Sequence, residues 1–138
     1  MVKALHIATG KQGEDLACTY LIKQGYRIIA RNWRPSLDNG QKAHALELDI
    51  IARLKKQLVF IEVKTRTGVT ALTPSAVDNF TFAKKKKLAK AAAYYLGAES
   101  TWEIPARFDL VCVDIQSDKT VNITSYENVI ELSASYGV

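Results

Sequence analysis

Two strand-like runs that follow each other almost directly constrain the fold of this chain more than any other feature. They are residues 46–54, LELDIIARL, and residues 57–66, QLVFIEVKTR. Alternating apolar and polar residues over this length are typical of β-strands, and the short connection predicts an antiparallel hairpin. A turn centred on the two intervening lysines pairs Ile50 with Ile61 and Ala52 with Val59.

The alternation also assigns each hairpin residue to one face of the sheet. The aliphatic face of the first strand comprises Leu46, Leu48, Ile50, Ala52 and Leu54. The opposite face carries Glu47 and Asp49, and the second strand places Glu62, Lys64 and Arg66 on that side. In this register, Asp49 lies opposite Glu62 and Glu47 lies opposite Lys64.

Opposed carboxylates destabilise a sheet unless something takes their charge. A divalent cation would do so, and Mg²⁺ commonly binds one or two carboxylates together with waters and phosphate oxygens. Lys64 would share a face with such an ion and could orient a water or neutralise charge on a phosphodiester. Alternatively, Glu47 and Lys64 form an ordinary cross-strand ion pair on a solvated sheet face, and Asp49 and Glu62 reach water or nearby arginines.

The other segments show helical and strand-like patterns in turn. Thr9 and Gln12 form a capping-box pattern before an apolar stripe that stops at Gly25, so a helix is expected over residues 10–24. Apolar residues that recur on one stripe predict a second helix over residues 79–96. We expect further strands over residues 26–33, 107–115 and 121–126, a loop over 34–45, and a short helix or tail over 127–138.

This order of elements, α-β-β-β-α-β-β, predicts an α/β fold with a central mixed β-sheet flanked by helices. The strands before and after the second helix would be parallel neighbours. The chain has 138 residues, which suits one domain with a real core. We expect a single domain over residues 1–138, with a core over about 9–126 and flexible ends at residues 1–8 and in the C-terminal tail.

Composition and charge narrow the class of protein. Cys18 and Cys112 lie in apolar segments without ligand spacing, so we expect buried thiols in a reducing compartment and no zinc site. No run approaches the roughly 18 apolar residues of a membrane span, so a cytoplasmic protein without membrane contact is expected. The net charge of +5 is compatible with a polyanionic partner such as nucleic acid, and an excess of this size is also common in ordinary soluble proteins.

A run of four lysines, residues 84–87, lies in the first half of the second predicted helix. Four successive residues point in every direction around one helical turn, so at most two of them can face a cleft. Our hypothesis is that Lys84, Lys85 and Lys87 contact phosphates. A solvated helix face is the alternative explanation.

Three other side chains have both functional and structural interpretations. Arg66 could hold a phosphate bidentately, or it could pair with Glu47 or Asp109. Arg107 and Asp109 share a strand face and would form a structural pair. Trp33 could stack on a base, although packing in the core or at its rim is the commoner role of a Trp at a strand end.

Asp49 followed by Glu62-Val63-Lys64 resembles the signature of the PD-(D/E)XK nuclease superfamily. The order of GKQGEDLACTYLIKQGYRIIARNW, ELDIIA, LVFIEVKTR, an alanine-rich basic helix and RFDLVCV is more specific. Over about residues 9–115, it resembles the YraN-type family of uncharacterised bacterial proteins, which are similar to Holliday junction resolvases and other restriction-endonuclease-like enzymes. The chain departs from that family at Leu46, where Gly or Ala is usual, and in a longer loop after the first strand.

The resemblance implies a restriction-endonuclease-like fold with a Mg²⁺ or Mn²⁺ site. The implied metal ligands are the carboxylates of Asp49 and Glu62, the main-chain carbonyl of Val63 and the carboxylate of Glu14. Lys64 would be catalytic and Glu47 a supporting residue. Glu14 can also be explained as an acid that is favourable near a helix N-terminus. DNA is the implied partner, and a homodimer is expected because a junction presents two scissile strands.

Two functions follow as hypotheses. The first is a metal-dependent endonuclease that hydrolyses phosphodiester bonds in DNA, including branched or damaged DNA. The second is a non-catalytic nucleic-acid-binding protein that retains the nuclease fold. The opposed carboxylates favour the first, because a binding module has no physical need for them. A structural or interaction domain would be indicated if the lysines of the second helix pointed away from the carboxylates.

Overall fold

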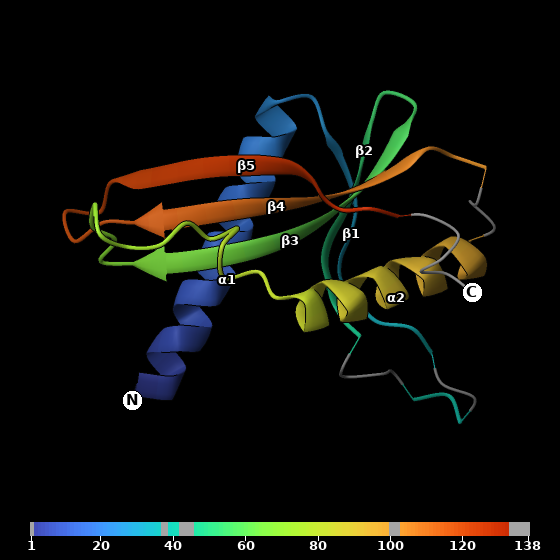
Figure 1. The fold of residues 1–138 in the computed structure, drawn as a ribbon, viewed down its shortest axis with the longest axis horizontal. Helices are drawn as coiled ribbons and strands as arrows, with labels where there is room; N and C mark the ends of the chain where they lie inside the picture. Colours follow the sequence, from blue (N-terminus) through green and yellow to red (C-terminus); the bar gives the residue numbers. More distant parts are fainter. Residues whose placement is uncertain (1, 37–38, 42–45, 100–102, 133–138) are drawn as a thin grey trace.

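The computed structural model describes residues 2–36, 39–41, 46–99 and 103–132, without the side chains of residues 2–8. Its elements in chain order are α1 (Val2–Lys23), β1 (Arg27–Trp33), β2 (Leu48–Leu54), β3 (Gln57–Thr67), α2 (Phe82–Ala98), β4 (Ala106–Ile115) and β5 (Val121–Ile130). Figure 1 shows a twisted sheet with a helix on each side. The predicted order of elements and the central mixed sheet with flanking helices are confirmed.

The five strands form one sheet in the order β1-β2-β3-β4-β5. Neighbouring strands are antiparallel except for β3 and β4, which are parallel and are connected through α2. The hairpin of β2 and β3 has the predicted register, with Ile50 opposite Ile61 and Ala52 opposite Val59. The hairpin and the parallel pair are therefore both confirmed.

Each helix covers one face of the sheet with its own hydrophobic core (Figure 1). On one face, Ala17 and Leu21 of α1 pack against aliphatic residues of β2, β3 and β4. On the other face, α2 packs against the aromatic side chains of β3 and β4. The rings of Tyr95 of α2 and Trp33 pack edge to face, with 5.2 Å between the ring centroids. Trp33 is thus held in packing, as the structural interpretation expected.

The boundaries of three elements differ from the predictions. The first helix begins at Val2, so Thr9 lies inside it and its capping-box pattern is not a cap. The second helix begins at Phe82 because the side chain of Thr81 accepts a hydrogen bond from the Lys84 N–H at 3.2 Å and caps it there. The last strand continues to Ile130, so the predicted helix or tail from residue 127 is wrong for its first four residues. Residues 133–138 lie outside the described residues.

The predicted aliphatic face of β2 is correct only in part. Ile50 lies in the core beneath α1, whereas Leu48 lies in the core beneath α2 with Leu46 packed against it. The alternation fails beside Asn32 of β1, which has a φ of +53° between the Arg31–Ile50 and Trp33–Leu48 pairs. This left-handed residue breaks the period of two at the end of the strand.

Both cysteines are free and buried, as predicted. Burial is the largest of the causes that raise the pKa of the Cys112 thiol to about 11, so this thiol stays protonated at neutral pH. Within the described part of the chain, no helix combines the length and the apolar character needed to cross a bilayer.

Candidate functional site

The site begins where the β2–β3 hairpin opens. The ladder of paired residues ends at Ile50 and Ile61, and the next two residues in register are Asp49 and Glu62. Beyond this point, the main-chain N–H of Val63 donates to Asp49 Oδ2 at 2.9 Å. A side-chain carboxylate thus replaces a main-chain acceptor where the two strands separate.

Asp49 and Glu62 interact through a side-chain hydrogen bond and through their charges. Burial, followed by the neighbouring charge of Glu62, raises the pKa of Asp49 to about 8. The hydrogen bond from Val63 lowers that pKa but does not cancel the increase. At neutral pH, the pair therefore holds a proton, which a bound cation would replace.

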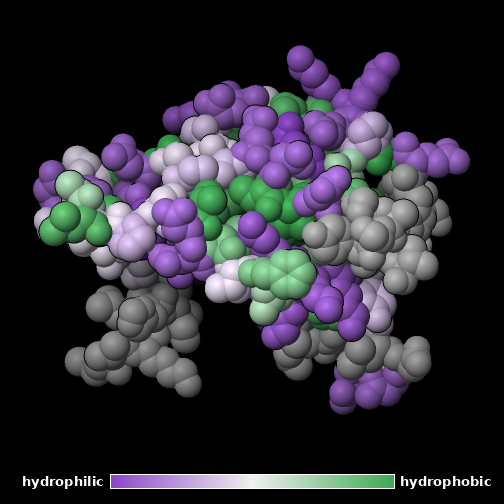
Figure 2. Space-filling view, viewed as in Figure 1, coloured by the Kyte–Doolittle hydropathy of each residue, from purple (hydrophilic) through white to green (hydrophobic). Residues whose placement is uncertain are grey.

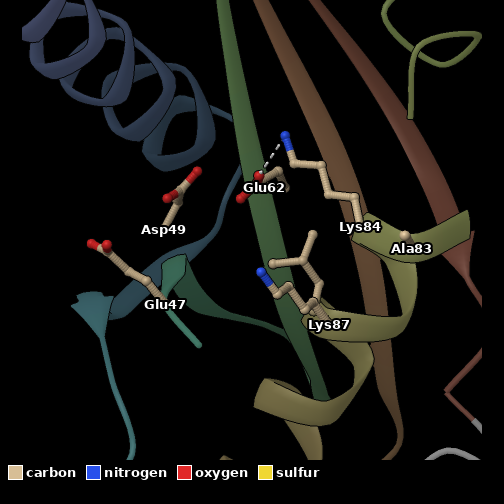
Figure 3. A pocket seen from close by; sticks show the side chains of 7 residues that line it. Glu47, Asp49, Glu62, Ala83, Lys84 and Lys87 are labelled. Carbon is tan, nitrogen blue, oxygen red and sulfur yellow. Dashed lines mark ion pairs between the residues drawn. The ribbon is translucent and has the colours of Figure 1, made fainter. Parts of the chain in front are cut away.

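A cleft of about 560 Å³ lies between this pair and the start of α2 (Figure 3). The residues that line it are Glu47, Asp49, Glu62, Ala83, Lys84, Lys87 and Leu88. Lys84 reaches across from α2, and its Nζ lies 3.4 Å from Glu62 Oε2. Two of the four lysines thus face the carboxylates, which disfavours a structural domain with its lysines turned away.

The start of α2 adds further positive potential. Its first turn contains no acidic residue, and a helix N-terminus favours anions. Lys85 does not line the cleft but extends over the Phe80 ring, with its Nζ 5.6 Å from the ring centroid. In Figure 2, hydrophobic and hydrophilic side chains lie together around the start of α2, where Phe82 is exposed. The α2 side of the cleft suits a phosphate, whereas the hairpin side suits a cation.

A second pair of carboxylates, Glu14 and Glu47, borders the first. With its amide nitrogen turned toward them, Asn32 donates to Glu14 Oε1 at 3.1 Å and to Glu47 Oε1 at 2.8 Å. Burial, followed by the charge of Asp49, raises the pKa of Glu14. Helix α1 thus brings Glu14 close enough to interact with the carboxylates of the hairpin.

Two arginines hold this second pair from outside. Arg31 lies 2.8 Å from Asp15 and 3.7 Å from Glu14, measured between side-chain nitrogen and oxygen atoms. The guanidinium of Arg34 binds Glu47 at 3.0 Å. The alternative pairing of Glu47 with Lys64 is therefore wrong, because Glu47 precedes β2 and turns toward Arg34 instead.

Sequence reasoning did not identify Asn32, Arg31 or Arg34 as part of the site. Asn is one of the few non-glycine residues that readily adopt a positive φ, so an Asn at the end of a strand was the available signal for a kink. Nothing in the spacing of the two arginines indicates their partners, which belong to other elements.

Other predicted site residues lie away from the cleft. Lys64 is exposed and does not line it. Arg66 binds Asp114 with two hydrogen bonds of 2.8 and 3.1 Å and also donates to the Pro74 carbonyl. The two partners considered for Arg66, Glu47 and Asp109, are both wrong.

The fit of these residues to a metal ion is specific. Among the residues with described side chains, no group of three or more His, Cys, Asp or Glu is arranged to hold one. Asp49 and Glu62 nevertheless present converging oxygen donors, which suit a hard cation that keeps waters and takes phosphate oxygens. The pair therefore fits Mg²⁺ or Mn²⁺ bound together with a substrate, and does not fit a cation enclosed by protein ligands alone.

The fold and the site define an α/β protein with a mixed sheet and an acidic, lysine-lined cleft at the opening of a hairpin. The chain belongs to the Uncharacterised protein family UPF0102, whose family model matches residues 13–113. The predicted family is thereby confirmed, whereas the wider superfamily placement stays a prediction.

Relatives in this family are readily found. A UPF0102 protein of Oleidesulfovibrio alaskensis is 45% identical over 112 residues, which are 81% of this chain and 50% of that protein. One from Nitratidesulfovibrio vulgaris is 40% identical over 137 residues, covering 99% of this chain and 93% of that protein. The chain thus spans half the length of the first relative and most of the second.

Among solved structures, Pyrococcus furiosus SfsA in complex with Ca²⁺ is similar with a TM-score of 0.36 and 16% identity. The match covers 91% of this chain and 65% of that one. A likeness at this level carries no argument about the function of this chain.

Proposed function

We propose that this protein is a metal-dependent endonuclease of the PD-(D/E)XK superfamily that hydrolyses phosphodiester bonds in DNA. The observation that carries the proposal is the Asp49–Glu62 pair, in which the pKa of Asp49 is raised to about 8 beside two cleft-lining lysines. Adjacent carboxylates cost a sheet stability, and strongly shifted pKa values in a cleft are typical of functional sites. A cation would neutralise the carboxylates of the cleft, and a phosphate bound with it would neutralise the lysines.

In this proposal, each side chain has a distinct role. A Mg²⁺ or Mn²⁺ ion bound here supplies a Lewis acid and lowers the pKa of a water. Asp49 and Glu62 hold it, with the Val63 carbonyl and Glu14 as the other proposed ligands. Lys64, two residues along β3 from Glu62, is proposed to stabilise the negative charge that develops on the phosphate during attack.

The remaining basic residues bind DNA in this proposal. Lys84 and Lys87 line the cleft and are assigned to the phosphates nearest the site. Lys85 and Arg66 extend the basic rim, although Arg66 is already held by Asp114. A branched substrate presents two scissile strands, so a homodimer is proposed for it.

A specific observation supports a second candidate, a non-catalytic DNA-binding protein with the same fold. Lys64 is exposed and lies outside the residues that line the cleft. In that case, Lys84 and Lys87 would still bind phosphates, and the Asp49–Glu62 pair would be retained without a catalytic use.

The first experiment is a cleavage assay on labelled linear, flapped and four-way DNA with Mg²⁺ or Mn²⁺. We expect metal-dependent cutting that falls at least about 100-fold in Asp49→Ala and Glu62→Gln, because both remove cation ligands. DNA affinity measured without metal by fluorescence anisotropy should stay within about threefold, since neither residue is assigned to phosphate.

The exposed Glu131 provides a matched control, and Glu131→Gln should cut like the wild type. Cleavage that survives both site substitutions would place the active site elsewhere. Normal DNA binding without any cleavage by the wild-type protein would favour the non-catalytic candidate.

A further inference from the structure

The ammonium of Lys84 is paired with Glu62, one of the two carboxylates that are assigned to the proposed cation. The Lys84 Nζ lies 3.4 Å from Glu62 Oε2, and the two side chains are 47% and 13% exposed. Figure 3 shows the lysine extending from α2 toward β3, with its nitrogen beside Glu62 on the side turned away from Asp49. Without a metal, this ammonium neutralises Glu62.

Lys84 is distinguished from the other lysines of the run by this contact. Lys87 lines the same cleft, but it forms no ion pair with any described residue. Lys85 lies over the Phe80 ring. Among the described lysines of the run, Lys84 alone therefore forms an ion pair with Glu62, a proposed metal ligand.

The position of Lys84 on the helix also suits binding to a second anion, a phosphate. It stands in the first turn of α2, where the main-chain N–H groups and the absence of acidic residues favour a phosphate. A lysine is a point charge on a flexible four-carbon stem, so it can change partner without movement of the backbone. The half-exposed side chain has room to do so.

We infer that Lys84 exchanges partners, binding Glu62 in the free protein and a DNA phosphate when a divalent cation takes its place at Glu62. The inference rests on the proposed function, because it assumes a cation and DNA in this cleft. Without DNA, a cation that binds Glu62 must displace the Lys84 ammonium, and this displacement lowers the affinity for the cation. A bound phosphate gives that ammonium a new partner, so DNA and metal each strengthen the binding of the other.

This coupling is reciprocal by thermodynamic necessity. If DNA tightens metal binding by some factor, the metal tightens DNA binding by the same factor. The coupling ensures that the site is completed only on DNA, which fits a carboxylate pair with too few protein ligands to hold a metal alone. Lys84 acts here as a positioning residue for metal and substrate.

The test compares wild type, Lys84→Met and Lys87→Met as full chains. Lys87→Met removes the same charge from the same cleft but breaks no ion pair, so it reports the general effect of charge. In calorimetric titration with Mn²⁺ and no DNA, Lys84→Met should bind about tenfold more tightly than wild type, whereas Lys87→Met should differ by less than about threefold.

The second measurement uses a labelled phosphorothioate duplex, with a four-way junction in parallel, and records DNA affinity by anisotropy with and without Mn²⁺. Mn²⁺ should tighten DNA binding about tenfold more in wild type and Lys87→Met than in Lys84→Met. Lys84→Arg should retain the coupling, because its charge can bind both partners.

Two results would overturn the inference, and they can be told apart. Mn²⁺ binding that is equal in wild type and Lys84→Met, and independent of DNA, refutes the exchange of partners while leaving a metal site. Absence of Mn²⁺ binding in every variant, with and without DNA, refutes the proposed function and the exchange together.

Discussion

The sheet contains carboxylates in two kinds of environment. On β4, Asp109 is only 1% exposed, yet it is fully bound: Arg107 Nε donates to its Oδ1 at 2.9 Å and the Asn128 N–H does so at the same distance. Asp114 is likewise bound by Arg66, which lowers its pKa. Asp49, by contrast, forms no ion pair with a described basic residue, and its pKa rises to about 8.

This difference distinguishes carboxylates that stabilise the fold through an arginine partner from a carboxylate that is free to bind a ligand. Both oxygens of Asp109 accept from Arg107, and Oδ1 also accepts from the Asn128 N–H, so this carboxylate is already engaged and is not available to a ligand. Asp49 has a protein donor in the Val63 N–H and a neighbour of its own sign in Glu62. The predicted structural pair of Arg107 and Asp109 is confirmed, and the uncompensated pair becomes the site.

The largest effect is expected from removing Arg107, the partner of the most buried carboxylate. Arg107→Met leaves Asp109 buried without its cationic partner, so the free energy of unfolding should fall by about 3–5 kcal/mol. Arg107 also binds the Tyr26 hydroxyl at 3.0 Å and the Gln57 side chain at 3.2 Å, which adds to the loss. Urea unfolding followed by circular dichroism measures this change.

Arg27 of β1 is exposed and provides the control for loss of an arginine. Arg27→Met should change the free energy of unfolding by no more than about 0.5 kcal/mol. Equal losses from both substitutions would show that Arg107 contributes general charge rather than compensation of Asp109.

A smaller and opposite effect is expected at Asp49. Its pKa rises from an ordinary 3.8 to about 8, so the folded protein binds more protons than the unfolded chain between these values. Stability must then fall as pH rises from about 4 to about 8. Asp49→Asn keeps an acceptor for the Val63 N–H and removes the charge. It should therefore stabilise the fold by about 1–3 kcal/mol at pH 8.5, and by little near pH 4.

The same substitution at Asp114 sharpens the comparison. The pKa of Asp114 is lowered, first by its hydrogen bond with Arg66, so its stabilisation is present above the ordinary pKa and lost as pH falls below it. Asp114→Asn should thus destabilise the fold at neutral pH. Thermal unfolding of Asp49→Asn and Asp114→Asn across pH measures the change in stability of each variant. If both variants were stabilised, or both destabilised, at neutral to basic pH, the two environments would not differ as described.

The sequence was sufficient for the part of the site that lies within the hairpin. Alternation and a two-residue connection determine the register, and the register brings Asp49 to Glu62. These are local relations, with few alternative pairings. The fold class followed in the same way from the order of elements.

The side-chain contacts between different helices and strands could not be predicted from the sequence pattern. The pairing of Glu47 with Arg34 depends on where two strands end and on the positive φ of Asn32. The run of four lysines alone allowed any pair to face the cleft, and the packing of α2 on the sheet through residues such as Leu88 and Ala91 brings Lys84 and Lys87, one turn earlier, to the cleft. Such features arise from tertiary packing, which spacing along the chain does not encode.

Glu14 extends the comparison, because its place beside Asp49 depends on how closely α1 packs on β3. A Cβ at Gly13 would overlap the side chain of Thr65, whereas a Cβ at Gly10 would meet nothing within 4 Å. Both positions are helical, so alanine at each should gain about 0.5–1 kcal/mol from helix propensity. Gly10→Ala should show that gain in urea unfolding. Gly13→Ala should instead show a net loss of about 1–2 kcal/mol, since the helix must move away from the sheet.

The displacement would also carry Glu14 away from the hairpin carboxylates. Gly13→Ala should therefore weaken Mn²⁺ binding measured in the presence of DNA, and Gly10→Ala should leave it unchanged. If Gly13→Ala loses stability but keeps its Mn²⁺ affinity, Glu14 is not a ligand, and since α1 begins at Val2 it is an acid in the middle of a helix packed on the sheet. If both alanines stabilise the fold equally, α1 does not approach β3 closely, and Glu14 does not lie beside the carboxylates of Asp49 and Glu47.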